Sequence, residues 1–417
     1  MRTYLVSATL GILFLVGCSH MQSSLAQPIA NTRPEQVYAN FSPANPPTHF
    51  SILHSFHGGS DGSGPDGGLV RDQAGNLYGT TAGGGNSGCY DNQGCGVIFK
   101  VDAAGNESVL YRFSGPDGGW PAAGLIRDFA GDLYGTTRMG GNSGCFMNLG
   151  CGVVFELDAS GNERVLHVFA GSDGASPEGE LIQDAAGNLY GTTTFGGAHP
   201  GCNNHMGCGV VFELDPSGNE TVLHSFTGSD GDGPTAALVR DQAGNLYGTT
   251  LLGGASNEGV AFKIDSNNHE IVLHSFNRTD GDFPSSTLIL GAGGNLFGTA
   301  AHGGSSRRFG VAFKLDSRGN ETILRNFGPK HGENPQAGLI MDGAGNFYGT
   351  TEGGGPLGWG VVFKLDRSGN ETVLHGFNRT DGDSIFAGVI RDAAGNLYGT
   401  AAGGGTSNNG VVFKLTH

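Results

Sequence analysis

A six-residue motif of the form Asn-Leu-Tyr-Gly-Thr-Thr recurs seven times along the chain, with small variations. Successive copies are separated by 56, 56, 57, 50, 51 and 50 residues. The copies begin at Asn76, Asp132, Asn188, Asn245, Asn295, Asn346 and Asn396. A period of this size is typical of solenoids, propellers and arrays, in which each repeat is one supersecondary unit.

Each repeat contains four short runs of strand-forming residues, which we name A to D in chain order. In the fourth repeat they are residues 237–241, 246–250, 259–265 and 270–276. The runs are rich in β-branched and aromatic residues and show no helical period. Segments of the form Asp-x-x-Gly-Asn follow the A run and most C runs, and they favour hairpin turns. Four strands joined by hairpins form one antiparallel sheet, the blade of a propeller.

The two ends of the repeat region predict how the ring closes. Residues 50–56 match a D run, whereas the chain ends on a C run at residues 410–415. The seventh blade therefore takes its D strand from the N-terminal side. We predict an all-β fold, a seven-bladed β-propeller of four-stranded antiparallel blades, closed by an N-terminal strand that completes the last blade. A solenoid is less consistent with the sequence, because it would need distinct capping repeats and none appear.

These residues resemble two families. The string Gly-Leu-Ile-Arg-Asp-x-x-Gly-Asn-Leu-Tyr, followed by Val-Val-Phe-x-Leu-Asp-x-x-Gly-Asn, is similar to NHL-type propeller repeats. The elements Gly-Asn-Leu-Tyr-Gly-Thr-Thr, Gly-Gly-Gly and Val-Val-Phe-Lys-Leu resemble the GloVer tandem-repeat proteins of bacterial surfaces more closely. The resemblance covers about residues 49–417. It implies a surface propeller and a cell-surface anchor, and it implies no particular ligand or reaction.

The first 48 residues have the layout of an export and anchoring segment. An apolar run at residues 5–16 follows Arg2 and is too short to cross a bilayer, so it is typical of a signal peptide. Leu-Val-Gly-Cys, ending at Cys18, resembles the lipobox of bacterial lipoproteins. A plain secretory signal with a chance Cys is the alternative. We expect a signal peptide at 1–17, a lipidated Cys18 with a flexible tether at 18–48, and the propeller at 49–417.

The net charge and the composition limit the classes of partner that we expect. The net charge of −16 argues against nucleic acid and anionic membrane surfaces, which both call for basic patches. We therefore expect contact with the membrane only through the lipid anchor, in an exported monomer at the bacterial outer membrane or cell surface. Glycine makes up 78 of 417 residues without a three-residue period, which excludes collagen-like order.

Six cysteines lie in the B–C loops of the first three repeats, which are about six residues longer than the rest. They form three Cys-x5-Cys segments, made by Cys89 and Cys95, Cys145 and Cys151, and Cys202 and Cys208. An even number of cysteines in an exported chain favours disulfides. Free thiols and zinc are the alternatives, since His205 lies inside one segment, although the spacing is wider than in usual zinc motifs.

Acidic residues mark the D–A loops, which share a face with the B–C loops in a propeller. Six of these loops carry Asp-Gly, and several carry a further carboxylate. The candidate binding face comprises Asp61, Asp117, Asp173, Asp230, Asp232, Asp280, Asp282, Glu333, Asp381 and Asp383. Such a ring could bind cations or sugar hydroxyls, or the Asp-Gly pairs could simply make turns. A complete calcium motif is missing, so we expect no cofactor and leave calcium open.

Enzyme signatures in the sequence lack their structural context. Gly-x-Ser-x-Gly at residues 58–62 has no helix after it, and the positions where A strands enter the channel are small residues apart from Glu180. We expect no catalytic residues, and predict a binding or scaffolding module for a glycan or a protein partner on the loop face. The alternative is a periplasmic or surface carbohydrate-active hydrolase or lyase that uses top-face carboxylates.

Overall fold

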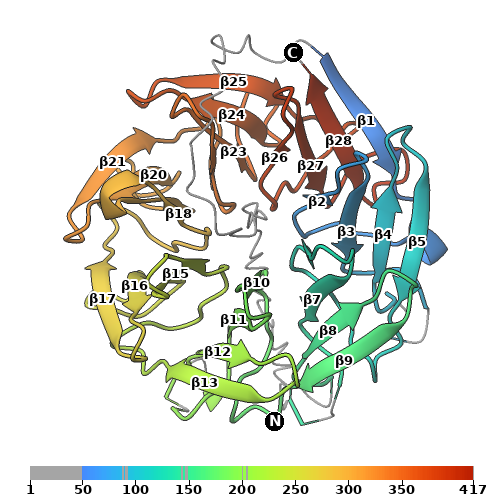
Figure 1. Ribbon diagram of the computed structural model, residues 1–417. Coiled ribbons are helices and arrows are strands. Elements are labelled where there is room, and N and C mark those ends of the chain that lie inside the picture. The colour runs from blue at the N-terminus through green and yellow to red at the C-terminus, as the bar shows by residue number, and fades with distance from the viewer. Residues whose placement is uncertain are drawn as a thin grey trace, which may run out of the picture.

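The computed structural model describes residues 49–416, apart from residues 87, 88, 90–92, 142, 143, 146–148, 200, 203 and 204. Seven four-stranded antiparallel sheets surround a central axis (Figure 1), which confirms the predicted seven-bladed propeller. The predicted signal peptide, Cys18 and the tether lie outside the described residues. Within the described ranges, no helix is long and apolar enough to span a membrane.

The strands follow the same order in every blade, with A nearest the axis and D at the rim. The A strands are β2 (Val70–Arg71), β6 (Ile126–Arg127), β10 (Ile182–Gln183), β14 (Val239–Arg240), β18 (Ile289–Leu290), β22 (Ile340–Met341) and β26 (Ile390–Arg391). The B strands are β3 (Leu77–Thr81), β7 (Leu133–Thr137), β11 (Leu189–Thr193), β15 (Leu246–Thr250), β19 (Leu296–Ala300), β23 (Phe347–Thr351) and β27 (Leu397–Ala401). The C strands are β4 (Val97–Val101), β8 (Val153–Leu157), β12 (Val210–Leu214), β16 (Val260–Ile264), β20 (Val311–Leu315), β24 (Val361–Leu365) and β28 (Val411–Thr416). The D strands are β5 (Glu107–Arg112), β9 (Glu163–Val168), β13 (Glu220–Ser225), β17 (Glu270–Ser275), β21 (Glu321–Asn326), β25 (Glu371–Gly376) and β1 (His49–Ser55), and two 3-10 turns are η1 (Gly59–Asp61) and η5 (Ala292–Gly294).

Ring closure uses the N-terminal strand, as predicted. We number the blades from 1, which begins at β2, to 7, which consists of β26, β27, β28 and β1. Strand β1 pairs antiparallel with β28, from His49 opposite Thr416 to Ser55 opposite Val411. The two ends of the described chain therefore meet in one sheet, and blades 7 and 1 are held together in the same way as the other neighbours.

Each position of the recurring motif has a structural task, beginning with its Tyr. The hydroxyl of Tyr247 donates to the carboxylate of Asp241 in the A–B turn at 3.0 Å. The equivalent bond is made by Tyr78, Tyr190, Tyr348 and Tyr398. Phe297 stands at this position in blade 5, where Gly291 replaces the turn Asp. The hydroxyl is thus missing in the blade that lacks the carboxylate to which it would donate. The Tyr position therefore contributes an aromatic ring and, where the turn has an Asp, a hydrogen bond to the A–B turn.

The Gly-Thr-Thr part of the motif fixes the blade to its neighbours. A Cβ at Gly248 would lie 2.6 Å from Cζ of Phe262, so only glycine lets the C-strand ring lie over the B strand. The hydroxyl of Thr249 donates to the carbonyl of Ser286 in the next blade. The hydroxyl of Thr250 accepts from the N–H of Val260 within its own blade.

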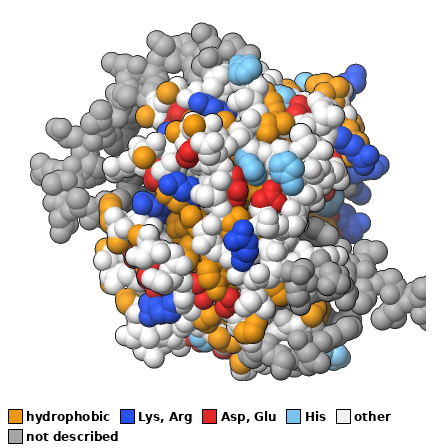
Figure 2. Space-filling model, turned by 90° about the vertical axis from the view of Figure 1, so that its right-hand side faces the viewer, with side chains coloured by type: hydrophobic (Ala, Val, Ile, Leu, Met, Phe, Trp, Pro, Cys, Tyr) orange, Lys and Arg blue, Asp and Glu red, His pale blue; other side chains and the backbone are white. Residues whose placement is uncertain are grey.

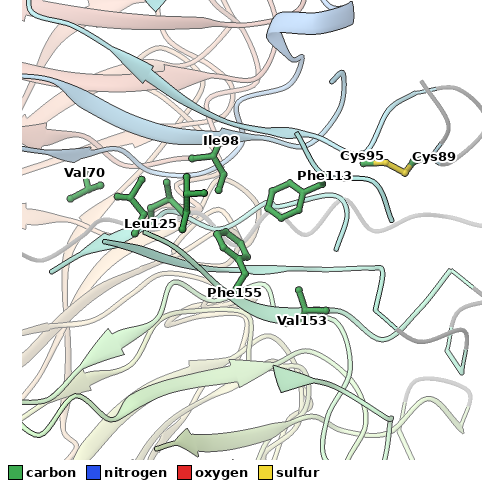
Figure 3. Packing of buried hydrophobic residues seen from close by; sticks show 10 residues of the cluster. Val70, Cys89, Cys95, Ile98, Phe113, Leu125, Val153 and Phe155 are labelled. Carbon is green, nitrogen blue, oxygen red and sulfur yellow. A yellow bond between two sulfur atoms is a disulfide. The ribbon is translucent and has the colours of Figure 1, made fainter. Parts of the chain in front are cut away.

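A ring of phenylalanine pairs forms the core between blades. The Phe that follows each D strand lies against the C-strand Phe of the next blade, with centroids 5.0–5.2 Å apart. Edge-to-face pairs of this kind add about 0.5–1.5 kcal/mol beyond the area they bury. Figure 3 shows one of them, Phe113 against Phe155, with Ile98 nearby and Leu125 and Val70 further along the same cluster.

The A strands are shorter than predicted. In blade 4 the predicted run of residues 237–241 is reduced to the two residues of β14. Just before this strand, the carbonyl of Ala236 accepts a hydrogen bond from Thr192 of blade 3. This carbonyl is therefore bonded to the neighbouring blade rather than to strand B.

We predict that Gly248→Ala destabilises the propeller by about 1–3 kcal/mol, because the added methyl group overpacks the space under Phe262. Gly343 is the matched control, since it lies in an A–B turn and a Cβ there would meet no atom within 4 Å. Urea unfolding of both variants checks this. Equal midpoints for Gly248→Ala and Gly343→Ala would contradict the packing role.

Candidate functional site

The D–A and B–C loops share one face of the ring. Backbone bridges join them in every blade, for example Asp232 with Leu252 and Asp282 with His302. The A–B and C–D turns are built alike: the turn Asp accepts backbone N–H bonds within its own turn, as Asp241 and Asp215 do. Differences between blades are therefore concentrated on the loop face, where binding sites usually lie.

The six Asp-Gly carboxylates each stabilise their own loop. In each, one oxygen accepts a backbone N–H three or four residues earlier, as Asp230 does from Thr227 at 2.8 Å. The six are Asp61, Asp117, Asp173, Asp230, Asp280 and Asp381. No two of them lie at the same blade junction, so they do not converge on one site. The hydrogen bond to the first oxygen is the one expected if the Asp-Gly pairs make turns.

In five of these aspartates, all but Asp61, the second oxygen faces a D-strand side chain at the rim. Nε2 of His167 lies 3.1 Å from Oδ2 of Asp173, and Nε2 of His224 lies 3.2 Å from Oδ2 of Asp230. The histidine rings pack edge-on against the phenylalanine two residues later. Histidine and acidic side chains can be seen side by side on the rim that carries β1, β4 and β5 (Figure 2).

A glutamate from the next blade completes most of these rim junctions. Glu321, the first residue of β21, lies near Asp280 and His274 of the preceding D strand and loop. Burial and the charge of Asp280 raise the pKa of Glu321 to about 7. Burial also raises the pKa values of Glu163, Glu220, Glu270 and Glu371 to about 7.

Three junctions depart from this pattern. Tyr111 replaces the histidine between blades 1 and 2, and its hydroxyl donates to Asp117. Arg325 replaces it between blades 5 and 6 and forms a 2.7 Å ion pair with Glu371. Between blades 6 and 7, Phe50 takes the place of the glutamate and stacks on His375 with centroids 3.9 Å apart.

The other predicted carboxylates lie further in along the D–A loops. Asp232, Asp282 and Asp383 are buried and Glu333 is half-buried, one in each of four loops. Asp282 has a partner that the sequence did not indicate, because its carboxyl group is hydrogen-bonded to Glu258 of the adjacent B–C loop. Burial and this second carboxylate raise the pKa of Asp282 to about 7. Glu258 is also paired with Arg278 at 2.8 Å.

A polar cluster on the loop face, next to the A strands, was not predicted from the sequence. Arg138, the first residue of a B–C loop in blade 2, forms a 2.8 Å ion pair with Glu178, whose side chain is 3% exposed. Its guanidinium lies over the ring of Trp120, 5.4 Å from the centroid. Asp66 of blade 1 interacts electrostatically with the same arginine. Three successive blades thus supply one cluster, which we call the mouth cluster.

Burial raises the pKa of each carboxyl group in the mouth cluster. Burial raises the pKa of Asp66 to about 7, with Arg138 acting in the opposite direction. Burial also raises the pKa of Glu178 and, well above its ordinary value, that of the neighbouring Glu180. The signal that could have found the cluster is the position after Pro65, Pro121 and Pro177, which holds a different residue in each blade.

The residue just before this proline position is left-handed in all seven loops. The backbone φ lies between 54° and 67° at Gly64, Trp120, Ser176, Gly233, Phe283, Asn334 and Ser384. Five of these residues are not glycine, and bulky residues rarely adopt this conformation. Each carbonyl accepts the N–H of the first B–C residue, as Trp120 does from Arg138 at 3.2 Å. Strain of this kind is characteristic of binding sites, where the surrounding structure holds it in place.

The three Cys-x5-Cys segments form disulfides, so the favoured prediction is confirmed. They rise from blades 1 to 3, the same blades that build the mouth cluster. A hollow of about 360 Å³ lies between the second and third cysteine loops, lined among others by Cys145, His205 and Met206. His205 therefore borders this hollow, and the two cysteines of its own loop are joined in a disulfide.

We predict that Glu321→Gln stabilises the protein more at about pH 8 than at about pH 5. A glutamate has a pKa of about 4.3 in the unfolded chain, and about 7 here. The native state thus binds more protons between these values, so this residue's contribution to stability falls as the pH rises through that window. Urea unfolding at both pH values measures the difference. A substitution at exposed Thr322 should have the same effect at both, and a pH-independent effect of Glu321→Gln would count against the buried carboxyl.

The sequence of the chain matches a known repeat family. The Gloeobacter/Verrucomicrobia repeat matches residues 38–204 and 198–413. No functionally curated protein shows significant sequence similarity to the chain.

Solved structures share the fold at low sequence identity. An extracellular domain described as part of a one-component system from B. thetaiotaomicron has a TM-score of 0.54 and 10% identity, covering 88% of this chain and 40% of that longer one. A gluconolactonase from Xanthomonas campestris has a TM-score of 0.42 and 15% identity, covering 73% of this chain and 87% of the enzyme. These similarities concern the fold. The repeat match spans almost all described residues, and the chain belongs to the Gloeobacter/Verrucomicrobia repeat family.

Proposed function

We propose that the protein is a binding module of the cell envelope that takes a neutral glycan at the mouth cluster, on the loop face above blades 1 to 3. The observation that carries the proposal is that Glu178, Trp120 and Asp66, from three successive loops, all interact with Arg138. The three disulfides and the repeat family indicate an extracellular or envelope protein.

The chemistry of the mouth cluster suits hydroxyl groups. A carboxyl group whose pKa is near 7 presents both a donor and an acceptor at neutral pH, as a sugar hydroxyl does. Arg138 adds donors in a fixed fork, and the half-buried ring of Trp120 offers an apolar surface.

The scaffold supports a preorganised site. The left-handed residues of the mouth are each held by a backbone hydrogen bond to the B–C loop, and disulfides close the three neighbouring loops. A rigid site loses less conformational entropy when it binds a ligand. The rigid loops around the mouth cluster therefore favour ligand binding, compared with loops that would have to rearrange.

The geometry gives less support to a carbohydrate hydrolase. Glycoside hydrolysis uses two carboxyl groups about 5–10 Å apart, with room for the sugar or a water molecule between them. Glu258 and Asp282 instead share a direct hydrogen bond. Two carboxyl groups in direct contact leave no space between them for the scissile bond.

Anchoring through Cys18 at the outer membrane or cell surface completes the proposal. The motivation is the Leu-Val-Gly-Cys string behind the apolar segment. Binding at the mouth would then act at the envelope, in a protein that reaches the membrane only through its lipid.

A glycan array and cell-envelope extracts, probed with the purified protein, test the proposal. We expect binding that Trp120→Gly weakens about tenfold, or about 1.4 kcal/mol. Gly64 and Gly233 hold the equivalent positions in two other blades, so glycine suits this backbone.

Phe283→Gly is the matched control, because it removes an aromatic ring at the equivalent left-handed position across the ring, in the loop that leads into blade 5. It should leave glycan binding unchanged. Equal losses in both variants, or no glycan binding at all, would contradict the mouth cluster as the site. Capture of a protein alone would identify a different class of partner.

A further inference from the structure

We propose that two rim junctions, one between blades 2 and 3 and one between blades 3 and 4, are binding sites for a divalent transition metal of the zinc class. This inference goes beyond glycan binding and does not depend on it. The sites are built from His167, Asp173 and Glu220, and from His224, Asp230 and Glu270.

The geometry brings three ligand atoms together at each junction. One nitrogen and two carboxylate oxygens lie within 4.8 Å of one another. The histidine and aspartate already touch, at 3.1 and 3.2 Å. In the described part of the chain, Oε1 of Glu220 and of Glu270 is buried and has no hydrogen-bond partner. Metal–ligand bonds of about 2 Å need ligand atoms some 3–4 Å apart, which small rotations of the glutamate would provide.

The donor set selects the class of metal. One imidazole nitrogen and two carboxylate oxygens suit zinc, with a water molecule in the fourth position. Calcium and magnesium prefer shells made of oxygen alone. The aspartate is oriented by the backbone, because its other oxygen accepts the N–H of Ala170 in one site and of Thr227 in the other.

The remaining junctions explain why only these two qualify. Asn277 and Asn378 each donate a side-chain N–H to Oδ2 of the local aspartate, at 2.6 and 2.8 Å, which occupies the ligand atom. At the equivalent positions Ala170 has no side-chain donor, and the hydroxyl of Thr227 bonds the other oxygen, Oδ1, of Asp230.

Other substitutions disable the junctions that lack such an asparagine. Between blades 7 and 1, His57 approaches the carboxylate of Asp61, and His54 is 4.0 Å away. Tyr111 and Arg325 replace the histidine at two further junctions. The chain therefore carries its own set of related junctions, in which the metal ligands are replaced or blocked in different ways.

A metal at these sites would tie three blades together. Each site takes two ligands from one blade and its following loop, and a third from the next blade. Because metal would bind the folded ring and not the separated blades, it would raise stability with concentration.

Zinc titration of the chelator-treated protein, followed by calorimetry, tests the inference. We expect two zinc ions per chain, and none at the rim in the double variant Ala170→Asn, Thr227→Asn, which copies the asparagine of the blocked junctions. Zinc should also raise the thermal midpoint of the wild type but not of this variant.

Two controls keep the test decisive. Ala170→Ser puts a hydroxyl where Ser114 bonds the other aspartate oxygen, Oδ1 of Asp117, so both sites should remain. The double variant His167→Tyr, His224→Tyr copies Tyr111 and should lose both sites if the asparagine variant fails to fold. Unchanged stoichiometry in either double variant, or no saturable binding up to about 1 mM zinc, would overturn the inference.

Discussion

The pairing of β1 with β28 is the constraint on which the rest of the structure depends. It joins residues 49–55 to residues 411–416, so that all seven sheets have four strands and β28 is not left as an unpaired edge. An unpaired strand edge would invite other chains to add to it. The aromatic contacts also run through the seam, because Phe56 of the last blade packs on Phe99 of the first. Closure therefore fixes the position of every loop relative to every other.

A closed ring separates what must stay constant from what can vary. The motif residues Gly248 and Thr249 hold strands and blades together, and their equivalents recur in each repeat. The loop face does not have to meet this requirement, and the position that follows Pro65, Pro121 and Pro177 holds a different residue in every blade. Blades 1 to 3 combine disulfide loops with the mouth cluster, so the ring has one distinctive side. A ligand site and its rigid support thus arise from three neighbouring copies of one repeat.

Sequence reasoning predicted the blades, the closure and the disulfides, because each rests on a local pattern or a count. The motif spacing gives the blades, and the strand types at residues 50–56 and 410–415 give the closure. It overestimated the A strands, since the bond from Thr192 to Ala236 joins residues of two different blades. It missed the pairing of Arg138 with Glu178 for the same reason. The rim junctions needed three residues from two blades, which a single repeat does not reveal.

Native-state hydrogen exchange of β28 tests the closed ring most directly. If β1 completes blade 7, the amides of β28 that pair with it should be as strongly protected as those of β12, a C strand flanked by its own blade's B and D strands. Protection should fall in both strands together, when the whole ring unfolds. Rapid exchange along β28, with β12 still protected, would show an open seventh blade and would contradict the account.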